Sequence, residues 1–165
     1  MWPDAYLEQA RSDWQMWQLI RAQKLPDCHA LHYLQMTCEK LGKAFLIRGR
    51  TISPQQAKQS HVAFKRFLQV VSRNPMLRNL LKMTASQLKA HINQLLPIAE
   101  TVERLTPALA HDGPNVEYPW ENPNREVHVP VSYNFQVVHE LRRPPGMNLL
   151  KTVDLVQQQF YRLFT

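Results

Sequence analysis

Acidic residues are absent from the sixty positions between Lys40 and Ala99 of this 165-residue chain. The same stretch carries eleven of the 20 lysines and arginines, whereas the segment 100–126 holds six acids against two bases. A block of one sign raises the local potential and attracts anionic partners, phosphates above all. It therefore favours binding of a nucleotide or nucleic acid, with an ordinary solvated helix face as the alternative.

Glycine, cysteine and long apolar runs are also scarce. The four glycines stand singly, which excludes the glycine-rich phosphate loops of Walker and dinucleotide-binding motifs. Cys28 and Cys38 lie ten residues apart in one expected helix. That is about 15 Å by helical rise, beyond disulfide reach, and it fits a reducing cytoplasm. No apolar run approaches a membrane span, and the first residues lack the pattern of a signal peptide. We expect a soluble cytoplasmic protein with no membrane partner.

Apolar residues recur at three- and four-residue steps through most of the chain, the pattern of helices with one buried face. Ser60 and Thr84 are candidate N-caps, and Pro97 is expected to kink a long helix. The expected helices cover about 3–23, 27–49, 60–71, 76–81, 84–102 and 149–163. Such stripes must bury against one another, so the sequence predicts one all-α domain over residues 1–165, an up-and-down bundle of four or five helices.

The segment from Pro107 to Pro145 departs from this pattern because it holds seven of the 12 prolines and several turn sequences. Within it, apolar residues alternate strictly with others, which predicts an extended segment over about 126–138 with one buried face. Pro130 excludes a central strand. We expect a long proline-rich loop with an extended or edge segment before the last helix.

Residues with catalytic or metal-binding chemistry are sparse. Cys28, His29 and His32 lie within about one helical turn, but no second pair of ligands matches them, so we expect no metal site and no cofactor. Arg104 and His111 are spaced as Arg-x6-His, which could combine a phosphate-holding guanidinium with an acid–base imidazole. With 12 arginines and seven histidines, such a spacing also arises by chance.

Three segments resemble the HEPN superfamily of helical domains. Residues 33–46 read Tyr-Leu-Gln-Met-Thr-Cys-Glu-Lys-Leu-Gly-Lys-Ala-Phe-Leu, similar to the family's second helix, Gln-x-x-x-Glu-Lys-x-x-Lys-Ala-x-Leu. Residues 60–68 are similar to its Thr-His-Asp-Leu-x-x-Leu-Leu helix start, with Val62 where an acid is common. Residues 117–119, Glu-Tyr-Pro, resemble its Arg-Tyr-Pro turn with glutamate in place of arginine. The resemblance extends loosely over about residues 4–165.

The resemblance implies a helical bundle, often dimeric, that in some members binds nucleotides or partners a nucleotidyltransferase. Other members cleave RNA through an Arg-x4–6-His pair, in toxin–antitoxin fashion. Arg104 and His111 have that spacing, but the polar residue that usually follows the arginine is missing here.

The leading hypothesis is a non-catalytic HEPN-like module, acting as a homodimer, that binds nucleotide or nucleic-acid phosphates through its basic second and third helices. The residues expected to bind phosphate are Lys40, Lys43, Arg48, Arg50, His61, Lys65 and Arg66. One alternative is a metal-independent ribonuclease with Arg104 and His111 as catalytic residues. Another is a protein-interaction bundle whose basic face meets an acidic partner, such as its own segment 100–126 across a dimer.

Overall fold

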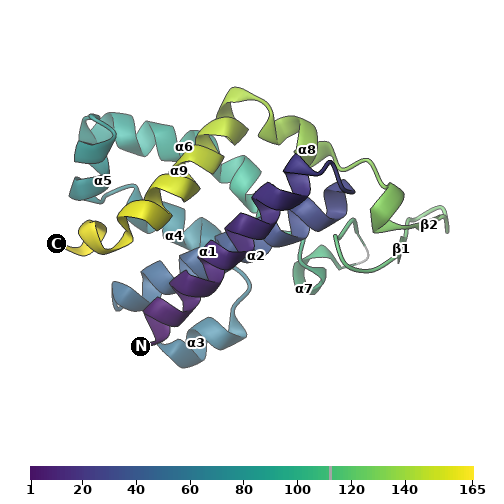
Figure 1. The fold of residues 1–165 in the computed structure, drawn as a ribbon, viewed down its shortest axis with the longest axis horizontal. Helices are drawn as coiled ribbons and strands as arrows, with labels where there is room; N and C mark the ends of the chain where they lie inside the picture. Colours follow the sequence, from purple (N-terminus) through teal and green to yellow (C-terminus); the bar gives the residue numbers. More distant parts are fainter. Residues whose placement is uncertain (112) are drawn as a thin grey trace.

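The computed structural model describes residues 1–111 and 113–165, and helices dominate these ranges (Figure 1). The α-helices are α1 (Trp2–Ala22), α2 (Asp27–Arg48), α3 (Pro54–Gln59), α4 (Ala63–Val71), α5 (Pro75–Leu80), α6 (Ala85–Glu103), α7 (Pro107–Ala110), α8 (Gln136–Leu141) and α9 (Pro144–Gln159). The shorter elements are β1 (Trp120–Glu121), β2 (Val127–His128) and the 3-10 helices η1 (Pro130–Ser132) and η2 (Phe160–Phe164). The all-α bundle predicted from the apolar stripes is confirmed.

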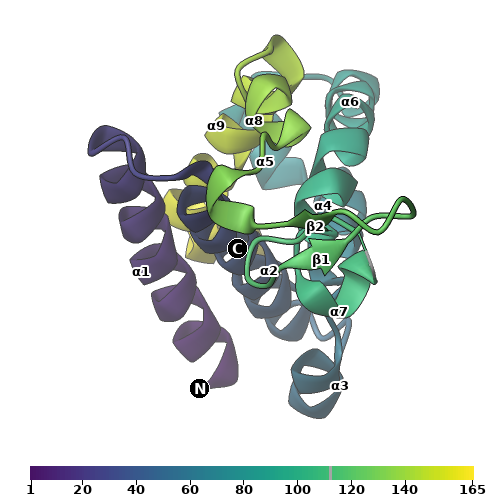
Figure 2. The same ribbon diagram turned by 90° about the vertical axis from the view of Figure 1, so that its right-hand side faces the viewer.

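The core lies between the long helices. α1 and α2 form a helical hairpin with the most extensive packing in the molecule, α2 packs on α4, α4 on α6, and α6 on α9 (Figures 1 and 2). Trp14 and Trp17 are buried and their rings stack with centroids 4.4 Å apart. Phe45 of α2 meets Phe67 of α4 edge to face, with centroids 5.0 Å apart. The contact between Phe45 and Phe67 fixes α4, one of the two helices that bear the candidate site, against α2.

The long helix α6 begins as predicted. Thr84 Oγ1 accepts a hydrogen bond from the amide of Gln87, and Gln87 Oε1 accepts one from the amide of Thr84, which is a complete capping box. Pro97 lies inside the helix, which continues to Glu103. The last residue of α6, Glu103, contacts the start of α4 through hydrogen bonds to two of its backbone amides.

The start of α4 differs from the prediction. Ser60 is not its cap: the helix begins at Ala63, and the hydroxyl of Ser60 accepts only the amide of Val62, at 3.3 Å. The cap is the carboxylate of Glu103, supplied by α6. Gly42 lets α4 approach α2, because a Cβ there would lie 2.8 Å from the carbonyl oxygen of Ala63. Tertiary contacts, which local sequence does not reveal, thus place this helix start.

Helix α3 was not predicted. It spans Pro54–Gln59 in a stretch that reads as a polar connection, and a capping box between Ser53 and Gln56 begins it. The six-residue helix buries only Ala57, so it leaves almost no apolar stripe in the sequence.

The proline-rich segment contains more structure than a loop, and its extended part is shorter than predicted. β1 pairs antiparallel with β2, and α7, η1 and α8 occupy other parts of the segment. Val127, Val129 and Val131 are 66%, 44% and 55% exposed, so the alternation does not mark a buried face there. The cause is that Pro130 begins a 3-10 turn and the next residues enter α8, which buries Val137.

Two further features bear on the environment of the chain. In the described ranges, no helix is both long enough and apolar enough to span a bilayer. Cys28 and Cys38 are both buried free thiols, as their separation predicted.

Candidate functional site

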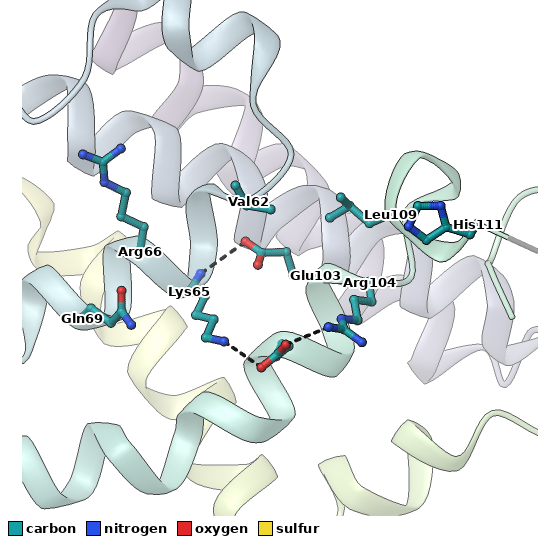
Figure 3. A pocket seen from close by; sticks show the side chains of 9 residues that line it. Val62, Lys65, Arg66, Gln69, Glu103, Arg104, Leu109 and His111 are labelled. Atoms are coloured by element: carbon teal, nitrogen blue, oxygen red, sulfur yellow. Dashed lines mark hydrogen bonds and ion pairs between the residues drawn. The ribbon is translucent and has the colours of Figure 1, made fainter. Parts of the chain in front are cut away.

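A groove with a volume of about 600 Å³ opens between the start of α4 and the end of α6 (Figure 3). We call it the basic groove. Its polar lining comes from Lys65, Arg66 and Gln69 of α4, Glu100 and Glu103 of α6, and Arg104 and His111. The fold therefore brings two of the predicted phosphate-binding residues together with both predicted catalytic residues, although some forty positions separate the two pairs.

Two cations of the groove converge on one carboxylate. Lys65 Nζ lies 2.7 Å from Glu100 Oε2, and Arg104 Nη2 lies 3.0 Å from Glu100 Oε1 (Figure 3). The hydrogen bond from Lys65 is the main cause that lowers the pKa of Glu100. Glu100 is 37% and Arg104 68% exposed, and ion pairs so open to water are weak. Glu100 thus places one carboxylate between Lys65 and Arg104 in ion pairs that are open to water.

The positive end of α4 is occupied by the chain itself. Glu103 is buried, and its Oε1 accepts the amides of Phe64 at 2.8 Å and Lys65 at 3.3 Å. Burial raises the pKa of Glu103, and the two amide hydrogen bonds act in the opposite direction. Because Glu103 fills this helix terminus, the groove presents side-chain cations, not backbone amides, to an incoming anion.

Arg66 and His111 lie at the two sides of the groove (Figure 3). Arg66 is exposed, pairs with no carboxylate in the described ranges, and is held only by a long contact of 3.5 Å to the carbonyl oxygen of Thr51. His111 is exposed and has φ 52° and ψ −124°, a conformation rare for residues other than glycine. Both side chains are thus open to a ligand.

Lys40 and Lys43 lie outside the basic groove. Lys40 Nζ is 2.6 Å from Asp13 Oδ2, and Lys43 Nζ is 2.5 Å from Glu39 Oε1. All four side chains are at most 18% exposed. Both ammonium groups therefore form ion pairs within the chain, which the acid-free block did not indicate.

The remaining predicted cations are also outside the groove. The guanidinium of Arg48 lies 5.7 Å from the ring centroid of Tyr161, and Arg50 is exposed just beyond the end of α2. His61 lies closer to the site: it immediately precedes the groove residue Val62, and its Nδ1 is 3.6 Å from Glu39 Oε1. The fold therefore disperses the predicted set over several surfaces.

Glu100 and Glu103 were missed by sequence reasoning. Glu100 stands four residues before Arg104, the spacing of a helical ion pair, and that signal could have found it. Nothing in the sequence could have found Glu103, because its partners are amides of another helix.

Comparison of the chain with protein-family models, curated proteins and solved structures gave no match. Residues 1–111 and 113–165 also contain no cluster of three or more His, Cys, Asp or Glu side chains arranged to hold a metal ion.

Proposed function

We propose that this chain is a HEPN-like helical module that binds the phosphates of RNA or of a nucleotide in the basic groove, without a catalytic role. The observation that carries the proposal is the convergence of Lys65 and Arg104 on a single exposed carboxylate. A phosphate group that displaces Glu100 gains the same two partners, and Arg66, which pairs with no carboxylate in the described ranges, lines the same groove. Guanidinium groups match phosphate geometry with paired hydrogen bonds, which favours this ligand over a single carboxylate.

The proposal predicts that substitutions of the two partners of one ion pair, Arg104 and Glu100, change RNA binding in opposite directions. In fluorescence anisotropy with a labelled single-stranded oligouridylate at low salt, Arg104→Gln weakens binding about tenfold, since a charged hydrogen bond to phosphate is lost. Glu100→Gln strengthens binding, because it removes the internal competitor of the phosphate.

Lys89→Gln is the matched control. Lys89 is exposed on α6 and lies outside the basic groove, so its loss removes one positive charge without touching the site. Binding that is unchanged in Arg104→Gln, or weakened as much in Lys89→Gln, would count against the proposal.

Ribonuclease activity is the second candidate, favoured by the presence of Arg104 and His111 in the same groove. In that case His111 would take the proton of a ribose 2′-hydroxyl as this oxygen attacks the adjacent phosphorus, and the 5′-oxygen would leave with a proton from solvent. Incubation of the protein with labelled RNA separates the two candidates. Recovery of intact RNA supports the non-catalytic proposal. Cleavage that is lost in His111→Ala supports ribonuclease activity in its place.

We place the protein in the cytoplasm as a homodimer, with a nucleotidyltransferase as a candidate partner. The free state of both cysteines supports a reducing compartment. The homodimer and the nucleotidyltransferase partner rest on the HEPN resemblance alone. Sedimentation equilibrium tests whether the protein is a dimer.

A further inference from the structure

A second groove, with a volume of about 760 Å³, adjoins the basic groove and shares His111 with it. We call it the aromatic groove. Its aromatic and polar side chains include those of His111, Tyr118, Trp120, Glu121, Asn122 and Arg125. The two grooves meet at His111, with the Lys65, Arg66 and Arg104 cations in the first groove and the Tyr118 and Trp120 rings in the second.

Tyr118 presents an aromatic ring to solvent from a fixed backbone. Tyr118 is 61% exposed. The carboxamide oxygen of the buried Asn115 accepts hydrogen bonds from the backbone amides of Tyr118 at 2.8 Å and Glu117 at 3.0 Å, which closes the turn that carries Tyr118. An exposed aromatic ring on an ordered turn is the usual platform for stacking a base of a single-stranded nucleic acid.

The rest of the aromatic groove is preformed. Trp120 is 8% exposed and packs edge to face on Tyr133, with centroids 4.7 Å apart. Asn122 Oδ1 accepts the amides of Asn124 at 2.9 Å and Glu126 at 3.0 Å, which fixes the hairpin loop that carries Arg125. A groove wall that is rigid before binding lowers the ordering cost of binding, and the exposed Arg125 lines the same groove as Tyr118.

We propose that the aromatic groove binds a nucleobase of single-stranded RNA, stacked on Tyr118, while a neighbouring phosphate of the same strand occupies the basic groove. The inference rests on the proposed function and narrows its ligand. The two grooves adjoin at His111, and a single strand carries phosphates and bases in alternation along its length, so it can place one group in each groove. A duplex keeps its bases stacked and paired, so it offers nothing to Tyr118.

The test compares a hexamer of oligoadenylate with a hexamer of the same ribose-phosphate backbone that lacks bases. The wild type binds oligoadenylate about tenfold more tightly, the size expected for one stacked base. Tyr118→Ala removes this preference and leaves affinity for the abasic hexamer unchanged, whereas Tyr118→Phe retains the preference. Tyr161→Ala is the matched control, because Tyr161 is 47% exposed but lies on η2 outside both grooves.

Each contrary result has a separate meaning. A base preference that persists in Tyr118→Ala, or equal binding of the two hexamers by the wild type, overturns the aromatic site and leaves phosphate binding intact. Failure of the wild type to bind either hexamer at low salt overturns both proposals. Circular dichroism verifies that each variant is folded, and Arg125→Gln provides a second variant, expected to weaken oligoadenylate binding severalfold.

Discussion

Two sets of cations from the same acid-free stretch have different surroundings in the folded protein. Lys40 and Lys43 are enclosed with Asp13 and Glu39, whereas Lys65 and Arg66 line an open groove. Asp13 and Glu39 both lie outside the stretch in sequence. A block of one charge in the sequence is therefore not a block of one charge in space, because tertiary contacts return the missing carboxylates.

The difference also separates structural ion pairs from exchangeable ones. Removing one partner of an enclosed pair leaves a buried charge without compensation, which is strongly destabilising. Removing one partner of the exposed Glu100 pairs leaves a charge that water solvates. Substitutions in the first set should therefore act on folding, and those in the second on binding.

Lys43→Met is expected to have the largest effect on stability. The substitution leaves the buried carboxylate of Glu39 with two polar partners, the side-chain amide of Gln35 at 2.9 Å and the more distant imidazole of His61. We expect a loss of about 3–5 kcal/mol in the free energy of unfolding, measured in urea. Lys89→Met on the exposed face of α6 should change it by about 0.5 kcal/mol or less. Equal values for both variants would contradict a structural role of the buried pair.

Glu103→Ala is expected to have the second-largest effect on stability. It leaves the amides of Phe64 and Lys65 without their acceptor, so the free energy of unfolding should fall by about 1–3 kcal/mol. Glu103→Gln retains an acceptor oxygen and avoids burying a charge, and it should cost much less. The cap is refuted if the alanine and glutamine variants unfold at the same urea concentration.

Glu100→Gln should have the smallest effect on stability, and its effect should depend on pH. Lys65 holds the folded-state pKa of Glu100 below its ordinary value of 4.5. The ion pair therefore contributes its stabilisation above about pH 4.5 and loses it as the pH falls through the lowered pKa. The difference between wild type and variant, measured by urea unfolding from pH 3 to 7, should shrink toward pH 3. A difference that grows in acid would show that another group is responsible.

The parts of the fold that follow from local sequence were predicted correctly. The stripes of α1, α2 and α6 repeat over four or more turns, and Thr84 carries its capping partner three residues away. The last helix was predicted over 149–163, but α9 begins earlier, at Pro144, because proline is tolerated in a first helical turn, and the 3-10 helix η2 replaces its end after Gln159. The start of α4 was not predicted, because the carboxylate of Glu103, from another helix, caps it. Helix α8 was not predicted either, because burial of Val137 and Leu141 against the rest of the protein favours it. The spacing of apolar residues predicts a helix only where residues within that helix, and not tertiary contacts, decide that it forms.

The candidate site was predicted less completely than the fold. Lys65, Arg66, Arg104 and His111 were identified by charge and spacing, yet nothing in the sequence indicates that they share a groove. Lys40 and Lys43 met the same criterion and lie elsewhere, since charge alone does not distinguish a lysine in an ion pair from one that faces a ligand.

The salt dependence of RNA binding tests the central claim most directly. The triple variant Lys65→Gln, Arg66→Gln, Arg104→Gln is compared with Arg73→Gln, Lys82→Gln, Lys89→Gln, which removes the same charge from exposed positions outside both grooves. With single-stranded RNA, loss of three phosphate contacts should flatten the plot of log affinity against log salt by about 2 units, and the control triple should leave the slope unchanged. Equal flattening in both triples would contradict a defined phosphate site and assign binding to the diffuse charge of the stretch.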